Sequence, residues 1–553
     1  MRSWKLVFIG VAAFAAACLS APLYQAPVHL DLVVAATTDV HGHLRGWDYY
    51  TNSPDTVQGL SRAATIVDSL RRASPVLPVL VDAGDILQGT PLTYVAARVD
   101  TTMEHPVIAA MNAMQYDAGV IGNHEFNYGL PTLDRAVREA QFPLLATNVY
   151  NLDGKQRYRG WGVSTRRGIK IALIGATTPG SMLWDHDNLA GKVEIRDIVP
   201  EVRSAVRDAV GAGASVIIVI VHSGLNEPSS YDTVGNKIGS ENVAARLAHE
   251  VPGIDLIVYG HSHKEMADTA IGHTLLMQPK NWAASVAVAH LTMEYAENHW
   301  HVIAKHSQLI PAMHHNENAA VLAATAQAHR EAVQYANTAI GTTPVTWRAD
   351  SARVVDTPLM DFISEVERRA TGAQLASTAA FSLDATLAAG PITVARIAAL
   401  YPYDNTLRAV RITGAQLRAY LEQSARYFRR GPDGQIGVDP SIPGYNYDMV
   451  SGVDYTIDLT RPIGERITEL EYQNHQVAPA DTFTMALNNY RQSGGGGFTM
   501  LHDAPVVYDH QQEIRQLLID EVRNKGTLQP SDYFHLNWHI VPASAIGTLL
   551  KSP

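Results

Sequence analysis

The sequence predicts an α/β domain in its first half and a separate α+β domain in its second half. Short strand-like segments alternate with amphipathic helical segments up to about residue 310, a pattern typical of a sheet covered by helices. An alanine-rich stretch follows, and beyond it helices and strands mix with glycine-rich turns. With 553 residues, 46% of them hydrophobic and 18% charged, the chain is long and apolar enough for more than one globular domain.

The first domain, predicted over residues 28–311, is built from apolar segments rich in β-branched residues. The segments 62–72 and 198–210 lie between them and have the spacing of helices that cover a sheet. The segments that we interpret as strands cover residues 30–38, 76–84, 118–123, 171–178, 214–222 and 254–261.

Residues 312–341 are predicted to form a helix that links the two domains. This stretch is rich in alanine, and residues 316–340 contain no glycine or proline. The second domain is predicted over residues 342–545. Its helices are expected at 358–370 and 414–425, and its strands at 453–460 and 466–473.

The N-terminus has the pattern of a secretory signal. Arg2 and Lys5 precede an uncharged apolar run that is too short to span a bilayer comfortably. We therefore expect residues 1–21 to direct export to the periplasm or cell envelope. Two kinds of processing fit the pattern. Either Cys18 is lipid-modified, although Ala15 stands where lipoprotein signals usually have leucine, or the chain is cleaved after a nearby alanine.

Charge and cysteine content exclude several classes of protein. The chain has 43 basic and 54 acidic residues, a net charge of -11, and no basic run, which argues against a nucleic-acid polymer as partner. Its single cysteine, Cys18, excludes a disulfide framework and a thiolate zinc site. We expect a monomer that contacts a membrane only through a lipid on Cys18.

Polar motifs follow five of the predicted strands of the first domain. In open α/β sheets, ligands bind outside the carboxyl ends of the strands, so these motifs are expected to converge on one crevice. Taken alone, each motif is weak, because a Gly-Asn pair is often a turn and two neighbouring histidines can simply be solvated. The motifs are Asp39-Val-His41, Gly84-Asp85, Gly122-Asn123-His124-Glu125, His222 and Gly260-His261-Ser262-His263.

Together, the residue types of these motifs suit two divalent metal ions. Imidazole nitrogens, carboxylates and an amide oxygen are ligands for Mn²⁺, Zn²⁺, Co²⁺ or Fe, and they do not identify which. Two neighbouring cations need a bridging carboxylate, for which Asp85 is the candidate. Such a pair activates water and clamps phosphoryl oxygens, so the pattern favours phosphate-ester hydrolysis. His43 and Glu125 are interpreted as supporting or structural residues.

These motifs resemble the calcineurin-type metallophosphoesterases, and in particular their exported 5'-nucleotidase branch. The segments YPYDNTL, VSGVDYTID and NNYRQSGGGGF extend the resemblance through the second domain. It implies a four-layer αββα domain, a nucleotide-binding C-terminal domain that holds the base between two aromatic rings, and a role for His124 at the phosphoryl transition state or leaving oxygen. It also implies a ligand set for each metal: Asp39, His41, Asp85 and His263 for one, and Asp85, Asn123, His222 and His261 for the other.

Within this branch the sequence is most similar to the 2',3'-cyclic-nucleotide 2'-phosphodiesterase/3'-nucleotidases. In GNHEFNYGL, Asn127 stands where 5'-nucleotidases usually have aspartate, and LASTAAFSLD lacks the arginine of their glycine-rich turn. The resemblance implies opening of 2',3'-cyclic nucleotides to 3'-nucleotides, which are then dephosphorylated to nucleosides for salvage. The alternatives are a 5'-nucleotidase or UDP-sugar hydrolase, and a nucleotide-binding surface protein without catalysis.

Asn127 has a physical consequence for the catalytic candidate His124. An amide oxygen accepts the Nδ1–H hydrogen bond of an imidazole but supplies no charge, so Asn127 is expected to orient His124 without raising its pKa as aspartate would. An Asn127→Asp change should therefore move the alkaline limb of the kcat/KM profile to higher pH, and an unchanged profile would contradict this expectation.

Candidates for nucleotide contacts lie in the second domain. Tyr447 and Phe498 are the expected base-stacking rings, with core packing as the alternative reading and Tyr445 as a neighbour that can exchange roles with Tyr447. Asn405 and Asn489 are further candidates, although asparagine in such a loop often serves only the turn.

Overall fold

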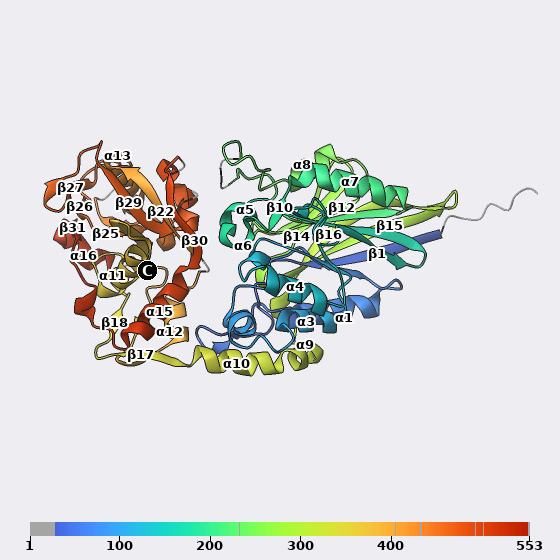
Figure 1. The fold of residues 1–553 in the computed structure, drawn as a ribbon, viewed down its shortest axis with the longest axis horizontal. Coiled ribbons are helices and arrows are strands. Elements are labelled where there is room, and N and C mark those ends of the chain that lie inside the picture. Colours follow the sequence, from blue (N-terminus) through green and yellow to red (C-terminus); the bar gives the residue numbers. More distant parts are fainter. Residues whose placement is uncertain are drawn as a thin grey trace, which may run out of the picture.

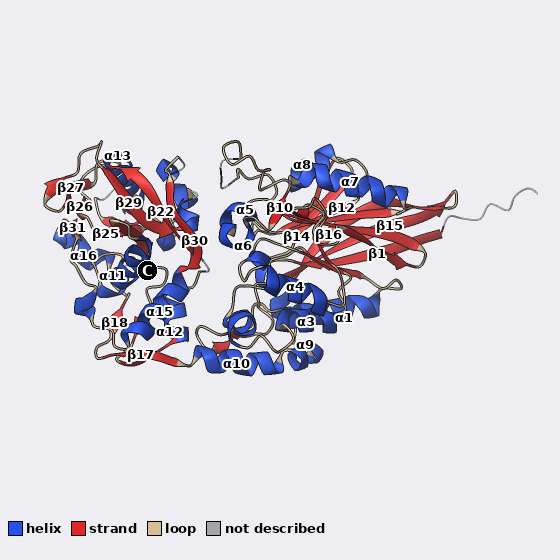
Figure 2. Ribbon diagram, in the orientation of Figure 1, coloured by secondary structure: helices blue, strands red, loops and turns tan. Residues whose placement is uncertain are grey.

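The computed structural model describes residues 28–229, 231, 233–403, 405–431, 434–492, 494–501 and 503–550. The signal predicted over residues 1–21, with Cys18, lies outside this part. The described residues form an α/β domain followed by an α+β domain, which confirms the predicted fold class (Figures 1 and 2). Within the same residues, none of the helices combines the length and the apolar character needed to cross a membrane.

Two six-stranded sheets form the centre of the first domain. The first has the order β16-β15-β1-β4-β5-β6 and the second the order β13-β14-β12-β11-β9-β8. The strands of the first sheet are β1 (Val28–Thr37), β4 (Val79–Asp82), β5 (Ala118–Val120), β6 (Leu144–Leu145), β15 (Ser285–Ala296) and β16 (His299–Pro311). Those of the second are β8 (Trp161–Arg166), β9 (Ile169–Thr177), β11 (Val216–His222), β12 (Leu256–Tyr259), β13 (Met266–Ile271) and β14 (Thr274–Gln278).

The sheets stack face to face and helices cover both outer faces. Alternation along β1 shows the layering: Leu32 and Val34 pack between the sheets, whereas Val33 and Ala35 face the helices. The outer face of the first sheet carries α1 (Leu60–Ala73), α3 (Pro106–Met114) and α4 (Leu130–Glu139). The second carries α7 (Ile198–Gly211) and α8 (Ala244–Glu250). The expected four-layer αββα arrangement is confirmed.

The link between the domains differs from the single helix expected over residues 312–341. It contains a 3₁₀ turn, α9 (Ala319–Ala324), α10 (Ala326–Ala336) and the start of β17 (Ala339–Thr343). Asn318 begins α9 by accepting from the backbone N–H of Ala320 at 2.9 Å. Thr325 separates the two helices; its hydroxyl donates back to the carbonyl of Val321 at 2.8 Å, and its φ of -102° and ψ of 6° leave the helical range. In Figure 1, α10 leads from the first domain into β17 of the second.

The second domain has a mixed five-stranded sheet of order β25-β19-β29-β22-β30. These strands are β19 (Leu375–Ala379), β22 (Thr406–Thr413), β25 (Asp448–Ser451), β29 (Thr482–Asn488) and β30 (Val506–Glu513). A smaller sheet contains β26 (Asp454–Asp458), β27 (Ile467–Tyr472), β28 (His475–Gln476) and β31 (Trp538–Val541). The helices are α11 (Pro358–Thr371), α12 (Val394–Leu400), α13 (Gly414–Ala425), α15 (Ile514–Lys525) and α16 (Ala543–Leu549). The helices expected at 358–370 and 414–425 are thus confirmed.

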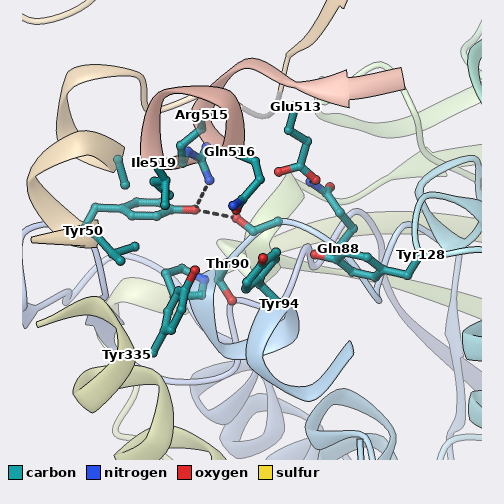
Figure 3. Close-up of a pocket in the computed structure, with 14 residues that line it drawn as sticks. Tyr50, Gln88, Thr90, Tyr94, Tyr128, Tyr335, Glu513, Arg515, Gln516 and Ile519 are labelled. Atoms are coloured by element: carbon teal, nitrogen blue, oxygen red, sulfur yellow. Dashed lines mark hydrogen bonds between the residues drawn. The ribbon is translucent and has the colours of Figure 1, made fainter. Parts of the chain in front are cut away.

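The two domains also meet through side chains at a seam shown in Figure 3. Arg515, at the start of α15, donates to the Tyr50 hydroxyl at 2.5 Å, and that hydroxyl donates to the Gly89 carbonyl at 2.9 Å. Gln88 donates to Glu513 at 3.4 Å. The contact attaches the loop that follows β4, which carries one of the functional motifs, to the second domain.

A buried carboxyl in the second domain leads to a stability prediction. Glu367 in α11 is 1% exposed, and neither of its oxygens has a hydrogen-bond partner within the described residues. Burial, and then the nearby charge of Asp448, raise its pKa well above the usual value. A carboxyl whose folded-state pKa is raised stabilises the fold below its unfolded pKa, and that contribution is lost as the pH rises.

We expect Glu367→Gln to have little effect on the melting temperature near pH 4.5. The variant should be the more stable by about 1–3 kcal/mol at pH 8. Thermal denaturation across this range measures the difference. If the difference in stability between the variant and the natural protein does not change with pH, Glu367 has an ordinary pKa.

Candidate active site

The predicted metal ligands lie at the carboxyl ends of parallel strands from both sheets, or in the turns that follow them. β1, β4 and β5 run parallel in the first sheet, as do β11 and β12 in the second. Five of these ligands have left-handed backbone, which is uncommon for residues other than glycine and collects at functional sites. Their φ angles are 47° for Asp39, 47° for His41, 59° for Asp85, 72° for His261 and 53° for His263.

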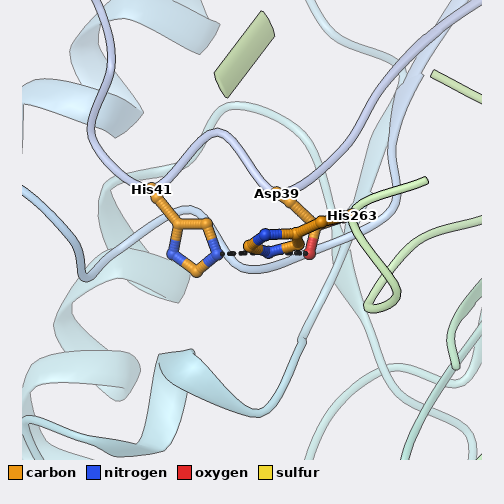
Figure 4. A group of neighbouring side chains, drawn as sticks. All are labelled: Asp39, His41 and His263. Atoms are coloured by element: carbon orange, nitrogen blue, oxygen red, sulfur yellow. Dashed lines mark hydrogen bonds and ion pairs between the residues drawn. The ribbon is translucent and has the colours of Figure 1, made fainter. Parts of the chain in front are cut away.

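Asp39, His41 and His263 form a first group of ligand atoms (Figure 4). The Nε2 atoms of His41 and His263 lie 3.2 Å apart, and His263 Nε2 is 3.4 Å from Asp39 Oδ1. The Nδ1 atom of His41 bonds the Gln88 carbonyl at 2.9 Å, so Nε2 is the nitrogen left to face the group. Burial lowers the pKa of His41 to about 4, which leaves its imidazole neutral at neutral pH.

Asp85, Asn123, His222 and His261 form a second group beside the first. His222 Nε2 lies 3.0 Å from Asp85 Oδ2 and 3.0 Å from Asn123 Oδ1, while its Nδ1 bonds the Ala83 carbonyl at 2.8 Å. Asp85 Oδ2 is also 3.8 Å from His41 Nε2 in the first group. Burial raises the pKa of Asp85, but the imidazoles of His222 and His124 outweigh it and hold that pKa well below the usual value. Asp85 is therefore the carboxylate that the two groups share.

Glu125 supports the turn that carries Asp85. Its fully buried carboxylate accepts hydrogen bonds from four backbone N–H groups, those of Asp85, Ile86, Leu87 and Gly122, at 2.5–3.0 Å. These bonds use both carboxylate oxygens, so Glu125 organises the backbone around the site, in keeping with its structural interpretation.

His124 lies at the open side of the ligand groups. Its Nε2 is 4.0 Å from Asp85 Oδ2, and its Nδ1 is 2.6 Å from Asn127 Oδ1, the contact that the sequence suggested. The Asn127 Nδ2 in turn donates to Asp185 Oδ1 at 2.9 Å. Asp185 was not among the predicted residues.

A cleft of about 430 Å³ joins this site to the second domain. It is lined by Asp85, His124 and His263 from the first domain and by Asn405, Arg408 and Asn489 from the second, among others. Arg408 is only 4% exposed and forms an ion pair with Asp509. Asn489 also accepts from the Thr406 N–H at 3.2 Å, so part of its role is to hold the turn.

The two rings expected to stack on a base are buried in the core, so that prediction is wrong for both. Tyr447 is 0% exposed and stacks on Tyr427, with ring centroids 5.0 Å apart. Phe498 is also 0% exposed and packs against Tyr420 at 4.5 Å. Both side chains point into the domain, where core packing, the alternative reading, accounts for them.

An open aromatic pocket lies next to these core rings. It has a volume of about 480 Å³ and is lined by Phe381, Tyr403, Tyr445 and Tyr490, with Asn405 and His263. Tyr403, Tyr445 and Tyr490 are 40–44% exposed. Tyr445, proposed as able to exchange roles with Tyr447, is thus the exposed ring of the two.

Arg491 lines this pocket and holds Tyr445, one of its walls, in place. Its guanidinium is 1% exposed and binds Asp448 at 2.7 and 2.9 Å. It also donates to the carbonyl of Tyr445 at 2.9 Å and to that of Gly495 at 2.5 Å. Arg491 of the segment NNYRQSGGGGF therefore supports the pocket, and Tyr490 of the same segment is one of its exposed rings.

Glu241 is a second functional candidate that the sequence did not reveal. It is 6% exposed, and its Oε1 accepts from His261 Nε2 at 2.8 Å. Because that nitrogen is engaged, Nδ1 is the atom of His261 left for a metal. Glu241 lies in a loop without a recognisable motif, so only the fold could reveal the contact.

Comparison with known proteins agrees with this geometry. Residues 32–265 match the family model described as calcineurin-like phosphoesterase, and residues 339–503 match the 5'-nucleotidase C-terminal domain. The chain is 30% identical to the 2',3'-cyclic-nucleotide 2'-phosphodiesterase/3'-nucleotidase of Haemophilus influenzae, over 97% of this chain and 92% of that protein. It is also 30% identical to the trifunctional nucleotide phosphoesterase YfkN of Bacillus subtilis, but spans only 40% of its length. A solved putative 5'-nucleotidase from Staphylococcus aureus has a TM-score of 0.72 and 27% identity, covering 92% of this chain and 99% of that one.

The fold and the site therefore define a calcineurin-like phosphoesterase, a class of phosphoric ester hydrolase that uses divalent metal ions. More closely, the chain belongs to the family of nucleotide phosphoesterases that carry a 5'-nucleotidase C-terminal domain. The residues present fit the metals of this class. Their imidazole, carboxylate and amide donors converge, and the remaining nitrogens of His41 and His222 are engaged by backbone carbonyls.

The contact between Glu241 and His261 leads to a prediction on metal affinity. A carboxylate that accepts the second N–H of a ligating histidine fixes the ring and raises its basicity, and its loss typically weakens metal binding about 10–100-fold. We expect a loss of this size in Glu241→Gln, measured as metal retained against graded concentrations of chelator. Glu227→Gln is the matched control, because Glu227 pairs with Lys264 at 2.6 Å instead. Equal retention in both variants would contradict the assignment.

Proposed function

We propose that the protein hydrolyses 2',3'-cyclic nucleotides to 3'-nucleotides and then dephosphorylates these to nucleosides, using two divalent metal ions. Asp39, His41 and His263 would hold one ion, and Asn123, His222 and His261 the other, with Asp85 between them. The donor types suit Mn²⁺, Zn²⁺, Co²⁺ or Fe. When bound, such a pair supplies an activated water and neutralises phosphoryl charge.

The observation that carries this proposal is the continuity of two cavities. His263, Asn405 and Tyr490 line both the cleft at the metal-ligand groups and the aromatic pocket of the second domain. A molecule with a phosphate at one end and an aromatic base at the other can therefore occupy both at once. Each cavity has a volume in the range usual for small-molecule sites.

The protein residues have separate tasks in this mechanism. Tyr445 and its neighbouring rings bind the base, which leaves the phosphorus beside Asp85. His124, held through Nδ1, presents Nε2 to the leaving ribose oxygen and delivers a proton to it. The first cycle opens the cyclic ester, and the 3'-phosphate then reseats for a second cycle.

The choice of this substrate class over a 5'-nucleotide rests on the departures in the sequence. Asn127 replaces aspartate beside His124, and the segment 375–384 lacks the arginine that helps 5'-nucleotidases bind nucleotide. The relatives named for 2',3'-cyclic nucleotides share most of the chain. A 5'-nucleotidase is the alternative that the test below separates.

The test is release of phosphate and nucleoside from 2',3'-cyclic AMP, 3'-AMP and 5'-AMP by the purified protein in Mn²⁺. Hydrolysis of the first two at rates at least tenfold above that of 5'-AMP is expected. Preference for 5'-AMP would overturn the substrate assignment. If none of the three nucleotides is hydrolysed although metal is bound, a nucleotide-binding protein without catalysis would be favoured.

The aromatic pocket leads to a prediction on substrate affinity. Stacking on an aromatic ring contributes about 1–3 kcal/mol per base, so Tyr445→Ala should raise KM for 3'-AMP about tenfold or more. KM for glycerol 2-phosphate, which has no base, should stay the same. Tyr295→Ala is the control, because Tyr295 is also 40% exposed but lies on β15, outside both cavities. If Tyr445→Ala raises KM equally for 3'-AMP and for glycerol 2-phosphate, the Tyr445 ring does not bind the base.

Export through the N-terminal signal, with or without a lipid on Cys18, is part of the same proposal. Arg2, Lys5 and the apolar run after them support it. An extracytoplasmic site suits an enzyme that converts nucleotides, which carry charge, into neutral nucleosides for uptake.

A further inference from the structure

The buried side of His124 contains a chain of hydrogen bonds that ends in a carboxylate. His124 Nδ1 bonds Asn127 Oδ1 at 2.6 Å, and Asn127 Nδ2 bonds Asp185 Oδ1 at 2.9 Å. Asp185 is 0% exposed, and its Oδ2 has no hydrogen-bond partner within the described residues. The chain therefore connects a catalytic candidate to a buried, incompletely satisfied carboxyl group.

The segment that carries Asp185 is built against the site. Asp185 lies between two short helices, α5 (Ser181–Trp184) and α6 (His186–Leu189). Trp184 stacks on His261 with ring centroids 5.6 Å apart. The Asn188 side chain donates to the carbonyls of Phe126 and Asn127 at 3.0 and 3.2 Å. These contacts fix the distance between Asp185 and Asn127.

A carboxylate at this place determines which way the Asn127 amide faces. Burial raises the pKa of Asp185 to about 6, so at neutral pH most of it is ionised and can only accept hydrogen bonds. The donor Nδ2 of Asn127 must then face Asp185, which turns the acceptor Oδ1 towards His124. An acceptor at this position selects the tautomer of His124 that carries hydrogen on Nδ1.

We propose that Asp185 is a positioning residue for His124, acting through the Asn127 amide. A carboxylate at position 127 would orient His124 by direct contact. Asp185 has the same orienting role, but the Asn127 side chain lies between it and His124. Nothing in the local sequence pattern marks it, because position 185 is 58 residues from Asn127. The proposal rests on the role of His124 in the proposed function.

Arg408 of the second domain adds a charge on the far side of this chain. It lines the same cleft as Asp185, is almost fully buried, and its Nε has no hydrogen-bond partner in the described part of the chain. Burial lowers the pKa of the Arg408 guanidinium to about 10, and the Asp185 charge opposes this shift. The other charged groups that act on Asp185 are His124 and Asp85.

The test is a reciprocal exchange of the two side chains. Asp185→Asn lets both amides turn either way, and should lower kcat about 10–100-fold with KM and metal content within about twofold of the natural protein. Asn127→Asp alone places two carboxylates in contact, so this variant should be impaired as well. In the double variant Asn127→Asp/Asp185→Asn, a single acceptor again faces His124, and kcat should recover to within about threefold of the natural protein.

Recovery in the double variant separates positioning from a merely structural role, which would make the two losses add. A kcat of Asp185→Asn equal to that of the natural protein, or a double variant no better than the worse single one, would overturn the proposal. Melting temperatures show whether each variant is folded. The assays use glycerol 2-phosphate as well as 3'-AMP. Both have an alkoxide leaving oxygen that needs a proton, so a wrong assignment of the nucleotide substrate does not affect the comparison.

Discussion

Replacing Asp85 with asparagine should abolish nearly all activity while leaving the fold intact. The Oδ2 atom of Asp85 lies within 3.8 Å of nitrogens from both ligand groups, so in the proposed two-metal site its charge would offset the repulsion between the two cations. Metal ions contribute several kcal/mol to the transition state, and each factor of ten corresponds to about 1.4 kcal/mol. We therefore expect kcat to fall at least about 10³-fold and metal content to fall to one ion per chain or fewer.

The fold should survive this change for a local reason. Asparagine tolerates the left-handed backbone at position 85, and its carbonyl can still accept the His124 N–H that Asp85 Oδ1 accepts at 2.8 Å. Asp82→Asn is the matched control. Asp82 is equally buried near the end of β4, but it binds Thr37 and Gly84 instead of the ligand groups. If Asp85→Asn keeps both metals and its activity, the bridging role is wrong.

Replacing His124 with glutamine should produce a loss that depends on the leaving group. His124 Nε2 lies at the mouth of the site, and a proton delivered from there matters most when the leaving oxygen is a poor one, as in ribose. We expect kcat for 3'-AMP to fall about 10²–10⁴-fold. The loss for p-nitrophenyl phosphate, whose leaving group departs without a proton, should stay below about tenfold.

Metal content serves as the control for the His124 variant, because this residue belongs to neither of the two proposed ligand sets. It should stay at the level of the natural protein. Equal losses for the two substrates would show that His124 stabilises phosphoryl charge instead of protonating the leaving oxygen.

The α/β character of the first domain, the α+β character of the second and the ligand groups could be predicted because the signals for them are local in the sequence. Each apolar segment ends in its own polar motif, and parallel strands bring such ends to one edge, so His222 and Asp85 meet although they are far apart in sequence. The long hairpin of β15 and β16 was not singled out, since its outward positions are polar and weaken the apolar pattern.

Other parts of the site depend on contacts that no local pattern records. Asp185 and Glu241 reach the site from loops, where neither spacing nor composition indicates a partner. The prediction of the base-stacking rings was wrong for another reason. Tyr445 and Tyr447 are two positions apart around a 3₁₀ turn, and only the turn decides that Tyr445 faces the pocket while Tyr447 enters the core.

A metal titration of the full chain tests whether two metal ions act together at the strand ends. Metal-free protein would receive Mn²⁺ in steps, with bound metal and hydrolysis of 2',3'-cyclic AMP measured at each step. Turnover is expected to rise to a plateau only when two ions are bound per chain. Full turnover with one ion bound, or turnover that persists in excess chelator, would contradict it.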